Sequence, residues 1–201
     1  MTHDNHQAFF DELAVEWDST FTAVDLEFLE HLVSKMDAQP GWDVLDLGCG
    51  TGVLFDLLRR QTGEKGSVTG VDFSIQMALK AHRNFPFDNV NVVDADVTTL
   101  PFGDSTFDMA VAFASFPHFS DKTKSLHELH RVLKDGARFY IVHLESSKEL
   151  TELHLRIGGA VAEDRLPSED NLRRMFAGSR FGDVSVRDHS GLYFVSALNH
   201  K

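Results

Sequence analysis

The chain of 201 residues has few of the features that mark secreted, membrane or fibrous proteins. It contains a single cysteine, Cys49, which excludes an internal disulfide and fits a reducing compartment. No apolar stretch reaches the roughly 18 residues of a membrane-spanning helix, and the first residues lack the basic and apolar regions of a secretory signal. No repeat, low-complexity tract or long linker interrupts the sequence. We therefore expect one cytoplasmic domain with no membrane insertion.

Basic side chains are also scarce. The 19 lysines and arginines face 31 aspartates and glutamates, which gives a formal net charge of −12. Such a surface repels a phosphate backbone, so the composition disfavours a nucleic-acid partner. The hydrophobic content of 42% is enough for the core of one α/β domain of ordinary size.

The most informative segment is residues 44–52, Val-Leu-Asp-Leu-Gly-Cys-Gly-Thr-Gly. An apolar run that carries Asp46 breaks into three alternate glycines, and a helical pattern follows at once. Glycines can take positive φ and allow a ligand close to the backbone, while the next helix offers unpaired N–H donors. A second apolar run ends in Asp72, whose carboxylate can accept both hydroxyls of a ribose. The two segments together predict an adenosine-binding site.

The loop departs from the dinucleotide fingerprint G-x-G-x-x-G at its last glycine, which is Val53 here. This departure disfavours a NAD-type oxidoreductase. A G-x-G-x-G loop with an acid two residues before its first glycine resembles motif I of the class I S-adenosylmethionine (SAM)-dependent methyltransferases. The resemblance continues in the right order through residues 40–145, at Asp72-Phe73-Ser74, Asp94 to Val97, Phe107 to Phe113 and Leu133 to Gly136. Within the family the chain is most similar to the small-molecule, type 11 branch, which includes quinone-biosynthesis-type enzymes.

The resemblance implies SAM as cofactor, S-adenosylhomocysteine as product and a small molecule as methyl acceptor. It also implies a set of cofactor-binding residues. These are Asp46, Gly48, Cys49, Gly50, Gly52, Asp72, Phe73, Met77, Asp96, Val97, Phe113 and Ala114. Asp96 and Val97 would flank the adenine, although Asp96 would also serve as a plain turn residue. Cys49 is interpreted as a small residue that contributes its backbone N–H. Trp17 either closes over the cofactor or packs the first helix against the domain.

Strand and helix patterns alternate along residues 41–145, which demands a doubly wound, mostly parallel sheet with helices on both faces. Expected strands are 43–48, 67–72, 90–94, 107–114 and 137–145; expected helices are 52–61, 74–84 and 121–133. A helix at 168–177 and strands at 183–188 and 192–198, joined by a tight turn, add a C-terminal antiparallel hairpin. The sheet would then have seven strands, with ligands at the carboxyl ends of the parallel ones.

We expect a single domain over residues 1–201 with four parts. Residues 1–40 carry two amphipathic helical patterns and form an N-terminal cover, and residues 41–145 form the cofactor-binding core. Residues 146–166 begin with a capping box, Ser146 to Glu149, and form a small lid helix after the fifth strand. Residues 167–201 form the last helix and the hairpin.

Methyl transfer from a sulfonium needs little covalent help, but a protonated acceptor would gain from a general base. The candidates are His118, just beyond the fourth strand, and His143 and Glu145, which alternation places on one face of the fifth. Each has a plainer interpretation: a loop histidine beside the cofactor, or side chains that face a covering helix. A metal site formed by these residues with His154 is a further alternative; its spacing matches no compact motif, so we expect none.

Two other functions remain open from the sequence alone. One is a non-catalytic module that binds SAM or S-adenosylhomocysteine for a partner protein, and the other is the disfavoured NAD-type oxidoreductase. The acceptor, the attacked atom and the oligomeric state are not predicted.

Overall fold

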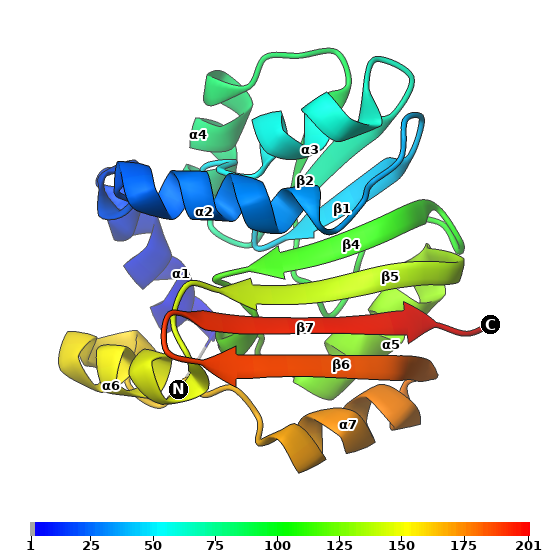
Figure 1. Ribbon diagram of the computed structural model, residues 1–201. Helices are drawn as coiled ribbons and strands as arrows, with labels where there is room; N and C mark the ends of the chain where they lie inside the picture. Colours follow the sequence, from blue (N-terminus) through cyan, green and yellow to red (C-terminus); the bar gives the residue numbers. More distant parts are fainter. Residues whose placement is uncertain (1–2) are drawn as a thin grey trace.

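The computed structural model describes residues 3–201 as a seven-stranded sheet with helices on both faces (Figure 1). The strand order is β3-β2-β1-β4-β5-β7-β6. The strands are β1 Asp43–Leu47, β2 Ser67–Asp72, β3 Val90–Asp94, β4 Phe107–Phe113, β5 Leu133–His143, β6 Phe181–His189 and β7 Leu192–Asn199. The first five pair in parallel, while β7 is antiparallel to both β5 and β6. The predicted α/β class, the mostly parallel sheet and the C-terminal hairpin are confirmed.

The helices lie between and around these strands. They are α1 His3–Leu13, η1 Trp17–Thr20, α2 Ala23–Ser34, α3 Phe55–Thr62, α4 Ile75–Asn84, η2 Phe116–His118, α5 Lys122–Val132, α6 Ser147–Ile157, η3 Gly159–Val161 and α7 Glu169–Gly178. Among residues 3–201, none of these helices is long and apolar enough to cross a membrane.

The central strands are apolar on both faces because each face is covered. On one face, side chains such as Val44 and Val111 pack with α2 and α3; on the other, Leu45 and Ala110 pack with α5 and α7. Figure 1 shows α1 and α6 beyond the edge at which the parallel strands end. That edge is where open α/β sheets bind ligands, so these two helices frame the expected site.

Two element boundaries differ from the sequence prediction for identifiable reasons. The helix after the glycine loop begins at Phe55 rather than at 52, because Gly52 has φ of +90°, which a right-handed helix cannot contain. Strand β5 begins at Leu133, where it already pairs with Phe107 before a register shift, and ends at His143 instead of 145. Glu145 therefore lies beyond the strand, and alternation does not place it on one face with His143.

Candidate functional site

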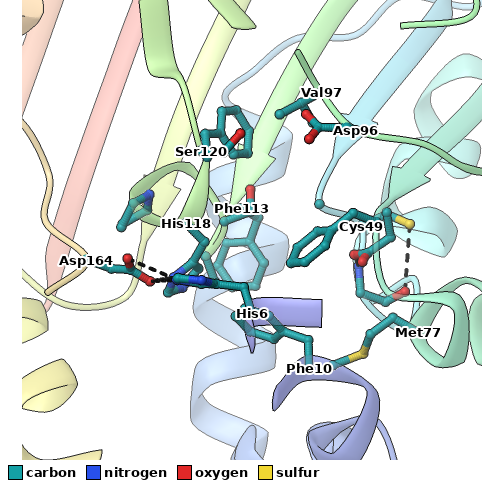
Figure 2. A pocket seen from close by; sticks show the side chains of 18 of the residues that line it. His6, Phe10, Cys49, Met77, Asp96, Val97, Phe113, His118, Ser120 and Asp164 are labelled. Atoms are coloured by element: carbon teal, nitrogen blue, oxygen red, sulfur yellow. Dashed lines mark hydrogen bonds and ion pairs between the residues drawn. The ribbon is translucent and has the colours of Figure 1, made fainter. Parts of the chain in front are cut away.

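A cavity of about 440 Å³ opens at the carboxyl ends of the parallel strands (Figure 2). Ten of the twelve expected cofactor residues line it: Gly48, Cys49, Gly50, Asp72, Phe73, Met77, Asp96, Val97, Phe113 and Ala114. Asp46 and Gly52 are not among the lining residues. His118 also lines the cavity, whereas His143 and Glu145 do not.

The glycine loop forms one wall of the cavity. Gly48 and Gly50 have φ of +65° and +54°, which side chains other than glycine rarely adopt. A Cβ on Gly48 would lie 2.5 Å from Cβ of Ser115, and one on Gly50 would lie 3.2 Å from Nε1 of Trp17. A side chain has no room at Gly48 and would press against Trp17 at Gly50. The N–H groups of Gly48 and Cys49 donate to the carbonyl oxygen of Val71, and that of Gly50 donates to Asp72, so the expected N–H of Cys49 is not free for a ligand.

Asp72 connects the loop to the second strand. Its carboxylate accepts hydrogen bonds from the backbone N–H groups of Gly50 and Ser74, both at 2.8 Å. Burial raises the pKa of Asp72 to about 6, although these two hydrogen bonds act in the opposite direction. A hydroxyl donor in the cavity would further favour the carboxylate form.

Asp46 lies behind the loop, and no hydrogen bond from the described residues opposes the effect of burial on its pKa. Neither of its carboxylate oxygens has a hydrogen-bond partner among residues 3–201. Burial, and then the nearby charge of Asp72, raise the pKa of Asp46 to about 8. The ionised form of such a buried acid is stabilised by a nearby cation or hydrogen-bond donor.

The N-terminal segment covers the cavity. His6 and Phe10 of α1 and Trp17 of η1 all line it. The carboxylate of Asp11 accepts hydrogen bonds from Oγ of Ser74 at 2.6 Å and from the N–H of Gln76 at 3.1 Å. A salt bridge of 2.8 Å joins Asp18 to Lys80. Residues 6–18 are thus attached to α4 and close over the cavity.

His118 lies at the opposite end of the cavity from Asp96 and Val97, with His6 and Asp164 beside it (Figure 2). Its Nδ1 is 2.6 Å from Oδ2 of Asp164, and Nε2 of His6 is 3.0 Å from the same oxygen. Burial lowers the pKa of His118, and the hydrogen bond to Asp164 opposes that shift. His118 is therefore neutral at physiological pH and able to accept a proton.

His154 does not line the cavity, but it packs against His118 and Asp164 at this end of it. Its side chain is buried, its ring centroid is 5.0 Å from that of His118, and Nδ1 is 2.9 Å from the backbone carbonyl oxygen of Asp164. Within the described part of the chain, no group of three or more histidine, cysteine, aspartate or glutamate side chains is arranged to hold a metal ion.

His143 and Glu145 lie away from the cavity surface. Both ring nitrogens of His143 are buried with no partner among residues 3–201, and burial lowers its pKa to about 3. Glu145 is half-buried, and burial raises its pKa. Their catalytic assignment stays a prediction.

Several cavity residues carry no signal of a functional role in the sequence: His6, Phe10, Lys122, Glu163, Asp164 and Arg165. Asp164 lies 46 positions from His118 and 158 from His6 in the chain. No motif surrounds it. The loss of helical pattern after Gly159 indicates only that a loop follows there.

Known proteins resemble the chain at several levels. A family model described as a methyltransferase domain matches residues 44–136. The chain is similar to a 2-phytyl-1,4-naphtoquinone methyltransferase of Nostoc punctiforme, with 36% identity over 72% of this chain and 67% of the relative. A demethylmenaquinone methyltransferase of Staphylococcus epidermidis is 27% identical over 96% of this chain and 91% of the relative.

These matches differ in extent. The alignment to the naphthoquinone enzyme of a second Nostoc strain spans only 63% of that relative's length. Among solved structures, a chain from the complex of the Haloferax volcanii Trm112 methyltransferase activator with a putative methyltransferase superposes with a TM-score of 0.80. That comparison covers 96% of this chain and 98% of the other at 20% identity, and it supports the fold alone.

Proposed function

The chain belongs to the class I SAM-dependent methyltransferases, and from that membership we propose that its methyl acceptor is a quinol-type aromatic small molecule. As such an enzyme it uses SAM and transfers the methyl group to a small-molecule acceptor. Two kinds of observation support the finer proposal. The relatives are named as naphthoquinone and demethylmenaquinone methyltransferases, and Phe10, Phe113 and Phe119 give the cavity an aromatic lining.

We propose that the glycine-loop end of the cavity holds SAM. Asp72 would accept the ribose hydroxyls, and Asp96 with Val97 would flank the adenine. The loop fits such a ligand, because Gly48 and Gly50 line the cavity without side chains, and a Cβ would clash with Ser115 at Gly48 and press against Trp17 at Gly50. The buried, unpartnered carboxylate of Asp46 fits a cationic cofactor bound against the loop. When bound, SAM supplies an electrophilic methyl group on a positively charged sulfur.

We propose His118 as the general base. An acceptor hydroxyl that loses its proton to Nε2 of His118 becomes a stronger nucleophile, at oxygen or at the conjugated ring carbon. The deprotonated acceptor would then attack the methyl group that bound SAM supplies, with S-adenosylhomocysteine as the leaving group; attack through a ring carbon would also release the proton of that carbon. The observation that carries this role is that His118 lines the cavity with Nδ1 held by Asp164. His143 and Glu145, which do not line the cavity, would act only through a residue that does.

We further propose that residues 146–166 act as a lid together with the N-terminal cover of residues 1–40. Glu163, Asp164 and Arg165 line the cavity, while no residue of α6 itself does. The lining part of the lid is therefore the loop after η3. We also infer a cytoplasmic location, which the single cysteine supports.

The acceptor proposal is tested by incubation of the protein with methyl-labelled SAM and chemically reduced, short-tailed quinols. Naphthoquinols, benzoquinols and simple phenols would be compared in parallel, and mass spectrometry would identify the methylated product. We expect transfer to quinols, with loss of about 10²-fold or more in kcat for His118→Gln. Transfer to simple phenols but to no quinol would contradict the proposed acceptor class.

A further inference from the structure

We infer that Asp164 is a positioning residue, which fixes His118 as the tautomer with the proton on Nδ1 and so directs Nε2 to the acceptor. The inference rests on the proposed role of His118 as base. It assigns a function to a residue that no motif marks, in the loop between η3 and α7.

The geometry around Asp164 is that of a shared acceptor. Its carboxylate contacts Nδ1 of His118 at 2.6 Å and Nε2 of His6 at 3.0 Å and 3.2 Å. The side chain is only 14% exposed, so the carboxylate is held away from bulk water. An ionised carboxylate can only accept hydrogen bonds, so both imidazoles must donate to it. His118 therefore carries its proton on Nδ1, and Nε2 keeps the lone pair.

The neighbouring groups favour the ionised form of Asp164. Although burial acts in the opposite direction, the hydrogen bonds from His118 and His6 lower its pKa. The other titratable groups that act on His118 are His154 of α6 and His143 of β5. Lys122 of α5 donates to the carbonyl oxygens of Pro117 and Phe119, which supports the η2 turn, and its charge acts on Asp164.

Contacts with α6 and α1 keep the carboxylate in position. Nδ1 of His154 is 2.9 Å from the carbonyl oxygen of Asp164, which attaches the loop to α6. On the other side, His6 attaches the same residue to α1, and the ring of Phe10 meets the ring of His118 edge-on at 5.0 Å. The contacts with α1 and α6 thus hold Asp164 beside His118 from two sides.

The test uses Asp164→Asn, with Asp164→Glu as the conservative variant and Asp188→Asn as a matched control. Asp188 also anchors α6, by accepting from the backbone N–H of Ser147 at 2.9 Å, and it does not line the cavity. Asp164→Asn should lower kcat about tenfold or more, with the KM for SAM changed less than about twofold. The control should leave both constants within about twofold, and Asp164→Glu should recover part of the loss.

The pH profile separates orientation from packing. Because the hydrogen bond and charge of Asp164 raise the pKa of His118, their removal should shift the acid limb of the kcat profile to lower pH. A purely structural role would lower the folded fraction and leave the position of the limb unchanged.

Nitrogen-15 NMR of His118 in the cofactor-free protein gives a readout that needs no turnover. At a pH where the ring is neutral, we expect the wild type to show a proton on Nδ1 and Asp164→Asn to show a mixture of tautomers. A proton on Nε2 in the wild type overturns the inference, even if no variant folds. If the tautomer is as expected but quinols are not methylated, the acceptor proposal fails while the positioning role stands.

Discussion

The two ends of the cavity are built in different ways. At the cofactor end, Gly50 and Asp72 are joined by a hydrogen bond across 22 positions, and both lie at strand ends of one sheet. At the acceptor end, His6, His118 and Asp164 come from a helix, a short turn and a loop, with up to 158 positions between them. A single strand–loop–helix–strand unit supplies the first arrangement. The second exists only after three distant segments have packed together.

Their electrostatics differ in the same way. Asp46 and Asp72 at the cofactor end have raised pKa values because burial isolates them from water. Asp164 at the acceptor end has a lowered pKa because two imidazoles donate to it, despite its burial. The cofactor end therefore gains most from a ligand that brings donors or positive charge. At the acceptor end, the carboxylate of Asp164 is already satisfied by the side chains of His118 and His6.

The largest effect that would sharpen this comparison is expected from Gly50→Val. The new side chain would occupy a position with φ of +54° and press against Trp17, so binding of S-adenosylhomocysteine should be abolished. Calorimetry and the ligand-induced rise in melting temperature would measure it. Gly136→Val is the control, because Gly136 has φ of +74°, has no atom within 4 Å of an added Cβ and does not line the cavity. Retained binding in a folded Gly50→Val protein would mean that the cofactor binds elsewhere.

Asp72→Ala should have the next largest effect. Loss of a charge-assisted contact to ribose typically costs about 1.5–3 kcal/mol per hydrogen bond, so affinity for S-adenosylhomocysteine should fall at least about tenfold. Asp94→Ala is matched, since Asp94 is the register partner of Asp72 on β3 but is exposed and does not line the cavity. Unchanged affinity in a folded Asp72→Ala protein, measured by calorimetry, would refute the ribose assignment.

The same contrast explains how far the sequence predicts the molecule. Strand alternation and the glycine loop determine local conformation, so the sheet, the hairpin and the lining positions of Asp72 and Asp96 are predictable. The packing of α1 onto the loop after η3 depends on contacts between distant segments, and no periodicity encodes it. The apolar pattern likewise does not mark the end of β5, which stops at His143 and leaves Glu145 outside the strand.

Asp46 should produce a smaller effect, on the pH dependence of stability. Its folded pKa of about 8 lies above its ordinary value of 3.8, so the unfolded chain releases the proton first as pH rises. Stability of the cofactor-free protein should therefore fall between about pH 4 and pH 8. Asp46→Asn removes this contribution, so its melting temperature should decline less steeply with pH. Between about pH 4 and pH 8, the melting temperature of the variant should fall by at least about 2 °C less than that of the wild type. Part of the slope should remain, because Asp72 also has a raised pKa. Parallel curves for the two proteins would mean that Asp46 is ionised in the folded state.

The smallest expected effect concerns the lid. Residues Glu163 to Arg165 and α1 line the cavity, whereas Leu155 and Ile157 of α6 are 57% and 50% exposed. A closed state is favoured by the contacts that bound ligands make with the cover. When cofactor and acceptor are both bound, hydrogen-exchange protection should therefore increase most in residues 6–18 and 159–165. It should increase only slightly in residues 147–157.

Measurement with and without S-adenosylhomocysteine, and then with acceptor added, would separate the two halves of the cavity. Cofactor alone should protect the segment around Trp17, because Trp17 faces the glycine loop. The acceptor should add protection around Asp164. Equal protection of all these segments in the free and doubly liganded protein would mean that the cover is fixed and that the acceptor enters without any closure.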